Sequence, residues 1–60
     1  MNIKQAIGQR IREFREQNKF SQEALAERSS ITYQYLSCVE NGKENVTIGV
    51  LEAIATALLP

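Results

Sequence analysis

Histidine and aspartate are both absent from this 60-residue sequence, and cysteine occurs once, as Cys38. Catalytic triads, zinc sites and calcium loops all need groups that are missing here. Glutamates remain, but on the surface of helices their usual role is that of solvated charge. The three glycines, Gly8, Gly42 and Gly49, stand too far apart to form a phosphate-binding loop. The sequence therefore predicts neither an enzyme nor a metal or cofactor site.

Disulfides and long apolar runs are missing as well. One cysteine cannot form an internal disulfide, and a small domain without disulfides is typical of a reducing cytosol. No apolar run approaches the ~18 residues of a membrane span. The first ten residues, MNIKQAIGQR, lack the continuous apolar segment of a signal peptide. We therefore expect a cytoplasmic protein.

The chain also lacks a net charge, since seven basic residues balance seven acidic ones. This balance argues mildly against nucleic acid as a partner, because proteins that bind polyanions usually carry a basic excess. The net charge is a weak guide, since the charge on the surface that contacts the partner decides whether nucleic acid can bind. The length and the hydrophobic content of 43% predict one small globular domain over residues 1–60.

The most informative stretch spans residues 21–43, SQEALAERSSITYQYLSCVENGK. Ser21 predicts a helix start, because its hydroxyl can accept a free backbone N–H where the charge of Glu23 also suits a helix N-terminus. Thr32 predicts a second start, and Gly42 a helix end in the left-handed conformation. Two short helices joined this tightly must cross steeply. They form the pattern of a helix-turn-helix unit, whose second helix lies in the DNA major groove.

Apolar periodicity predicts a further helix on each side of this unit. Apolar residues recur at spacings of four, four and three from Ile3 to Phe14, and Thr47 can cap a last helix. We therefore predict an all-α fold. Its helices should lie near 3–17, 21–28, 32–41 and 47–58. Its core should contain Ile7, Ile11, Phe14, Leu25, Ala26, Ile31, Leu36, Val39, Leu51 and Ile54.

The chain resembles the helix-turn-helix domain of the phage Cro and repressor type, also called the XRE family. The matching features are Phe20-Ser21-Gln22-Glu23, Leu25-Ala26, Ile31-Thr32, Tyr35-Leu36-Ser37 and Val39-Glu40-Asn41-Gly42-Lys43. The flanking helices match too, so the resemblance covers nearly the whole chain. It implies a compact four-helix, lambda-repressor-like domain with its helix-turn-helix unit at about 21–41. A fifth helix commonly follows in this family, and without one we expect a piece of a longer protein rather than an unusually short member.

One position departs from the family pattern. The family usually has glycine at the turn where this chain has Ser30. If Ser30 adopts a positive φ, the strain relative to glycine is about 1 kcal/mol.

The resemblance assigns two sets of residues to DNA. The base-reading candidates are Tyr33, Gln34, Ser37 and Cys38, and the phosphate-binding candidates are Gln22, Tyr35, Asn41 and Lys43. Gln34 is the strongest, because its amide can pair bidentately with adenine. Cys38 stands where the family usually has a long polar residue, and it is as readily an inert filler as a contact to a thymine methyl. The alternatives are a surface aromatic for Tyr33, core packing for Tyr35 and plain solvation for Lys43.

The family also implies an ion pair. An arginine of the first helix often pairs with the glutamate that ends the recognition helix, and Arg15 and Glu40 match these positions. Breaking one partner of a buried pair costs about 3–5 kcal/mol. The alternative is two independent surface charges.

The function implied is sequence-specific binding of double-stranded DNA by a transcriptional regulator such as a repressor, encoded by a bacterium or a phage and acting at the nucleoid. Its recognition helix, about 32–41, would enter the major groove, and a homodimer would bind a palindromic operator. The alternative is a protein-interaction module derived from this fold, to which the neutral charge and the short side chains of Ser37 and Cys38 would be suited. Salt dependence separates the two, because release of counterions makes DNA affinity fall with salt.

Overall fold

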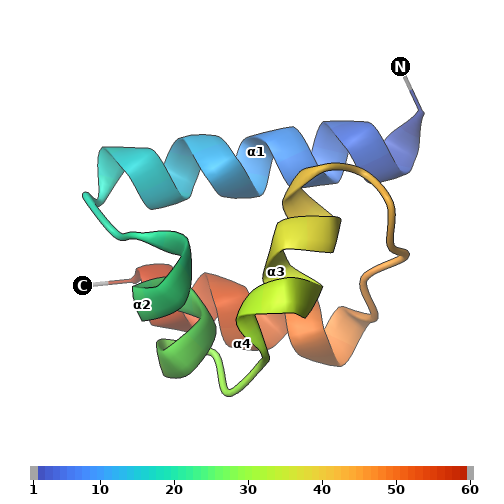
Figure 1. The fold of residues 1–60 in the computed structure, drawn as a ribbon. Coiled ribbons are helices and arrows are strands. Elements are labelled where there is room, and N and C mark those ends of the chain that lie inside the picture. Colours follow the sequence, from blue (N-terminus) through green and yellow to red (C-terminus); the bar gives the residue numbers. More distant parts are fainter. Residues whose placement is uncertain (1, 60) are drawn as a thin grey trace.

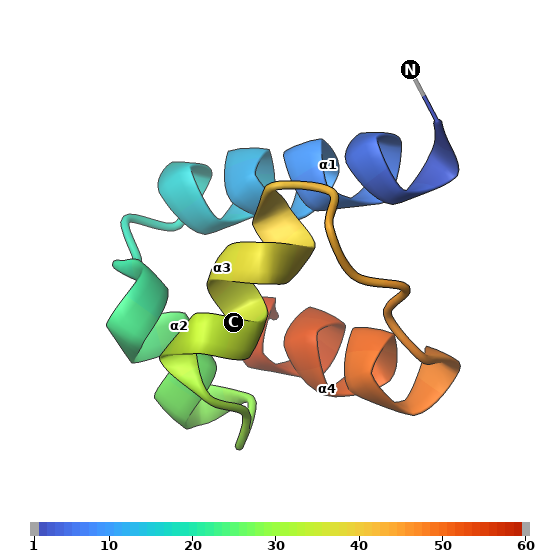
Figure 2. The same cartoon turned by 45° about the vertical axis from the view of Figure 1, so that its right-hand side comes forward.

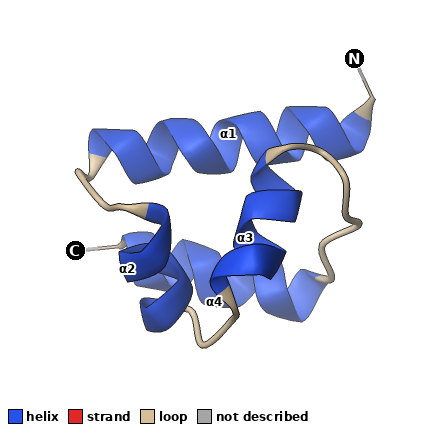
Figure 3. Ribbon diagram, viewed as in Figure 1, coloured by secondary structure: helices blue, strands red, loops and turns tan. Residues whose placement is uncertain are grey.

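The computed structural model describes residues 2–59, and within them the chain forms four α-helices and no strand (Figure 1, Figure 3). The helices are α1, Ile3–Gln17; α2, Gln22–Arg28; α3, Tyr33–Glu40; and α4, Ile48–Leu58. The predicted all-α fold is confirmed, with every predicted helix boundary correct to within one residue. Residues 1 and 60, the ends of the predicted domain, lie outside the described residues. None of the described helices is both long and apolar enough to cross a membrane.

Polar side chains begin all four helices. The hydroxyls of Ser21, Thr32 and Thr47 accept backbone N–H groups three residues ahead, at 3.0, 3.0 and 3.1 Å. All three caps were predicted. The sequence analysis did not predict the cap of α1, where Asn2 Oδ1 accepts the Gln5 N–H at 2.9 Å and Gln5 Oε1 accepts the Asn2 N–H at 3.1 Å. This reciprocal pair satisfies two donors that a helix N-terminus leaves free.

The core lies between α3 and its neighbours. Helix α3 packs against α1 and α2, and α2 also packs against α4. The buried apolar residues are Ile11, Leu25, Ala26, Leu36, Val39, Ile54 and Ala57, all predicted except Ala57. The predicted core residues Ile7 and Ile31 are half-buried and pack against this cluster.

The prediction that Phe14 and Leu51 belong to the buried core is wrong. Their exposed fractions are 43% and 37%. Both line an apolar groove between α1 and α4, together with Ile7, Ile11, Ile54, Ala55, Leu58 and Leu59. The apolar period correctly placed them on the inward side of their helices. Phe14 and Leu51 nevertheless stay partly exposed, because none of the described residues covers the groove.

Helix α1 runs past the C-terminal end of α3 (Figure 2), and the two backbones come very close at Gly8. A Cβ added at Gly8 would overlap the carbonyl oxygen of Val39 and would lie 2.9 Å from that of Glu40. Gly8 is buried at this crossing. The absence of a side chain at Gly8 is therefore what lets the two backbones meet.

The turns use left-handed backbone at the two positions considered from the sequence and also at Lys19, φ 61°, where it was not expected. Gly42 ends α3 at φ 74°, and Ser30 has φ 59° in the turn between α2 and α3. The turn is closed by the Ile31 N–H, which donates to the carbonyl of Ala26 at 3.0 Å. A serine thus holds a backbone conformation in which glycine carries less strain.

Candidate nucleic-acid interface

The outer face of α3 carries the predicted base-reading residues. Leu36 and Val39 turn inward and are buried, whereas Tyr33 and Gln34 are exposed at the start of the helix. Successive helical residues are about 100° apart, so Tyr33, Ser37, Gln34 and Cys38 share an arc of roughly 140°. We call these four residues the reading face.

The side chains of the reading face make no hydrogen bond with any of the described residues. Tyr33 and Gln34 project freely, whereas Ser37 and Cys38 are half-buried and short. The Cys38 thiol is free. No group of three potential metal ligands occurs in residues 2–59. This face can therefore offer an amide, a phenol and a hydroxyl to an external partner.

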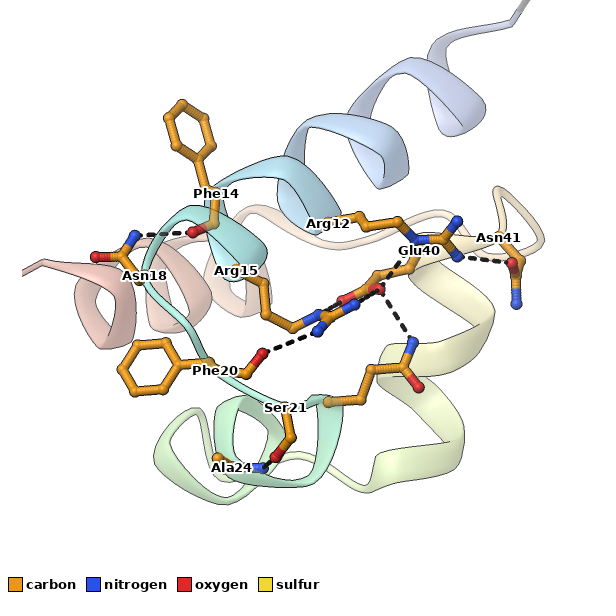
Figure 4. Close-up of polar contacts among 10 residues, drawn as sticks. Arg12, Phe14, Arg15, Asn18, Phe20, Ser21, Ala24, Glu40 and Asn41 are labelled. Carbon is orange, nitrogen blue, oxygen red and sulfur yellow. Dashed lines mark hydrogen bonds and ion pairs between the residues drawn. The ribbon is translucent and has the colours of Figure 1, made fainter.

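A buried carboxylate, that of Glu40, anchors α3 to the rest of the domain (Figure 4). The Glu40 side chain is 0% exposed. Arg15 of α1 donates to it twice, from Nε to Oε2 at 2.7 Å and from Nη2 to Oε1 at 3.0 Å. Arg15 Nη1 also donates to the carbonyl of Phe20 at 2.9 Å. The two residues predicted as an ion pair thus lie in direct bidentate contact, and they connect α1 with the end of α3.

Two further side chains reach the same carboxylate. Gln22 Nε2 donates to Glu40 Oε1 at 3.0 Å, and Arg12 Nε donates to this oxygen at 3.4 Å. Arg12 Nη2 also donates to Asn41 Oδ1 at 3.1 Å. We call Arg12, Arg15, Gln22, Glu40 and Asn41 the Glu40 cluster. It joins α1, the start of α2 and the end of α3.

The electrostatics of this cluster keep Glu40 ionised. Burial alone would raise the pKa of Glu40, but hydrogen bonds from Arg15, Gln22 and Arg12 together with the charge of Arg15 lower it below its ordinary value. The same hydrogen bonding to Glu40 raises the pKa of Arg15. The ion pair is therefore charged on both sides at neutral pH.

The predicted phosphate-binding residues fall into different environments. Asn41 and Lys43 are exposed just beyond α3, on either side of Gly42. Gln22 is half-buried, and its amide nitrogen is turned toward Glu40. Tyr35 is half-buried and packs against the core, which agrees with the alternative given for it. Gln22 contacts the Glu40 carboxylate directly and Asn41 joins the cluster through Arg12, whereas Tyr35 is not part of it.

The site residues predicted from the sequence did not include Arg12. A signal was present, since Arg12 stands three residues before Arg15 and residues at this spacing share a helix face. The bond from Gln22 to Glu40 left no such signal. It joins residues 18 positions apart, and only the crossing of the helices brings them together.

Comparison with known proteins identifies the family. A family model described as helix-turn-helix matches residues 11–58. The control protein C.SmaI of Serratia marcescens is 40% identical over 58 residues, which cover 97% of this chain and 69% of that protein. The immunity repressor protein of Bacillus phage phi105 is 38% identical over 52 residues, 87% of this chain and 36% of the repressor's length.

A solved structure agrees with these relatives. The crystal structure of the restriction-modification controller protein C.AhdI from Aeromonas hydrophila superposes with a TM-score of 0.90 at 40% identity. The match covers 92% of this chain and 83% of the controller. Fold, sequence and family model agree, and the chain belongs to the helix-turn-helix family of the Cro and phage-repressor type.

Proposed function

We propose that this chain binds double-stranded DNA sequence-specifically, as the DNA-binding domain of a transcriptional regulator. The observation that carries the proposal is the reading face of α3, whose side chains make no hydrogen bond with residues 2–59, while the C-terminal end of the same helix is held by the buried Glu40. A helix held this firmly can present base-reading groups with little loss of entropy on binding. Relatives that are named as a control protein and an immunity repressor support a regulatory role.

The geometry supports separate roles for residues that contact base edges and residues that hold the DNA backbone. Tyr33 and Gln34 stand at the start of α3, the part of a recognition helix that contacts base edges. Asn41 and Lys43 follow its end, where exposed polar groups can hold the DNA backbone. We assign base reading to Tyr33, Gln34, Ser37 and Cys38, and backbone contacts to Gln22, Asn41 and Lys43. Tyr35 is the weakest of the predicted backbone contacts, because it packs against the core.

Each chain would read one half-site, and a homodimer would bind a palindrome. Half-sites of helix-turn-helix dimers lie about one helical turn of DNA apart, roughly 34 Å. The principal dimensions of this domain are 29 × 20 × 18 Å. Two copies on one face of a duplex fit this spacing.

A protein-interaction module remains the second candidate, and a specific observation favours it. The apolar groove between α1 and α4 leaves Phe14 and Leu51 partly exposed, and the chain has no basic excess. A protein partner would be suited to both features.

The deciding experiment is the selection of bound sequences from a pool of random duplex DNA, using the full-length protein. A DNA-reading regulator should enrich one motif, and a palindromic motif would support the homodimer. Binding without any enriched motif would contradict sequence-specific reading. If no duplex is retained at all, the protein-interaction module becomes the better account.

A further inference from the structure

In a chain without net charge, DNA contact depends on the positive charges that are not neutralised within the fold. Arg10 is 67% exposed, but it pairs with Glu13 at 3.0 Å and lies over the ring of Phe14, which lines the groove between α1 and α4. Arg15 lies against both oxygens of Glu40, and only 12% of its side chain is exposed. Neither arginine is therefore well placed to meet a phosphate.

The Glu40 cluster nevertheless carries a net positive charge, since two arginines surround one carboxylate. Arg15 already makes the two short bonds to it, at 2.7 and 3.0 Å. Arg12 adds only a 3.4 Å contact, and 42% of its side chain is exposed. The charge that is left over therefore resides on Arg12.

Arg12 also lies in a suitable place. Its Nη2 donates to Asn41 Oδ1 at 3.1 Å, which fixes the guanidinium beside the end of α3 (Figure 4). Gln22 reaches the same carboxylate oxygen from the start of α2. The two bonds that the structure gives Arg12 use two of its five N–H donors. The remaining donors are available to an acceptor from outside.

Opposing charges limit where that acceptor can lie. Arg12 borders a polar cleft that is also lined by Glu13 and Glu16 of α1. Arg10 neutralises Glu13, but Glu16 would repel an anion inside the cleft. A phosphate is therefore favoured at the rim next to Asn41 and disfavoured within the cleft.

We propose that Arg12 is a DNA-backbone contact, held by Glu40 and Asn41 so that it donates to a phosphate beside the end of α3. This inference rests on the proposed function and adds a residue to it. The guanidinium suits the role, because its fork can bind the carboxylate and amide on one side while it offers N–H groups to a phosphate on the other.

The test compares Arg12→Gln with Arg10→Gln, a matched change of an α1 arginine that is paired with Glu13. Affinity for the selected duplex and for a scrambled one is measured from about 50 to 200 mM salt. Loss of one phosphate contact should reduce the log–log salt slope by about 0.9. Over this range the wild-type protein should thus lose ~3.5-fold more affinity than Arg12→Gln. Both duplexes should be affected alike, and Arg10→Gln should keep the wild-type slope.

An Arg12→Gln slope equal to that of the wild type would overturn the Arg12 contact and leave the proposed function intact. A wild-type protein that binds no duplex would overturn both. If Arg12→Gln does not fold, the Arg12 contact is tested by NMR on the wild-type protein. The Arg12 Nε–H resonance, assigned by its absence from Arg12→Lys, should shift on titration with duplex. The Arg10 resonance should not, and an unmoved Arg12 resonance would rule out the contact.

Discussion

At the scale of single residues, Gln34 is the sharpest test of base reading. It is exposed near the start of α3, and its amide makes no hydrogen bond with any residue of the described part of the chain. Gln34→Ala should remove base-edge bonds and cost ~1–3 kcal/mol on the preferred site. Discrimination against scrambled DNA should fall with it. Competition titrations measure both, and an equal loss on the two duplexes would leave specificity to Tyr33 or Cys38.

Gln22 is the same side chain in another environment. Gln22→Ala should weaken binding to preferred and scrambled duplexes by a similar factor, because we assign Gln22 to a contact with the DNA backbone, which carries no sequence information. It should also lower the free energy of unfolding by about 1.5–3 kcal/mol, since the amide donates to the buried Glu40 carboxylate. Urea titration separates this loss from the loss of binding. Gln34→Ala is the control, with an unfolding free energy close to that of the wild type.

At the scale of elements, the Glu40 cluster predicts how stability depends on pH. The pKa of Glu40 is lowered in the folded state, so its contribution is fully present above the unfolded pKa, about 4.5. It is lost as pH falls through the folded value. Urea titrations from about pH 7 to pH 3 should therefore show stability falling on the acid side.

The control for this pH dependence is Glu44→Gln, a change of an exposed carboxylate in the loop after α3. It should keep the wild-type acid profile. Arg15→Met removes the principal partner of Glu40 and leaves the carboxylate buried, so it should destabilise the domain by about 3–5 kcal/mol at neutral pH. A stable Arg15→Met protein would show that α3 does not need the Arg15–Glu40 pair as its anchor.

The crossing of α1 and α3 provides a second prediction at this scale. Gly8→Ala should lower the free energy of unfolding by about 1–3 kcal/mol, because the new Cβ overlaps the Val39 carbonyl. Gly49→Ala is the matched control. Nothing lies within 4 Å of its added Cβ, so it should be neutral or stabilising by up to about 1 kcal/mol. If both variants unfold at the same urea concentration, α1 does not need its glycine.

The helices could be predicted closely because their signals are local. Ser21, Thr32 and Thr47 cap them through bonds that span three residues. The errors have a different origin. Phe14 and Leu51 were placed in the core by a period that says which side of a helix is apolar but not what covers it. The contacts of Arg12 and Gln22 with Glu40 depend on how the helices cross.

At the scale of the whole molecule, the question is how a neutral domain holds a polyanion. Arg15 is almost enclosed and is neutralised by Glu40, so its charge is not available to a phosphate. Lys43 is exposed just beyond α3, and Arg12 carries the spare charge of the Glu40 cluster. Few phosphates can therefore be neutralised, and neutral donors such as Asn41 must supply the rest.

A shallow salt dependence follows from this distribution of charge. Each phosphate neutralised contributes about 0.9 to the log–log slope, so Lys43 and Arg12 together predict a slope of roughly −2 per subunit. Lys43→Gln should reduce the slope by about 0.9. Arg10→Gln should leave it unchanged, because Arg10 is already paired with Glu13 at 3.0 Å. Fluorescence anisotropy with labelled duplex measures all three slopes.

A wild-type slope near zero would mean that the complex does not depend on phosphates. The apolar groove between α1 and α4 would then be the surface to test with a protein partner.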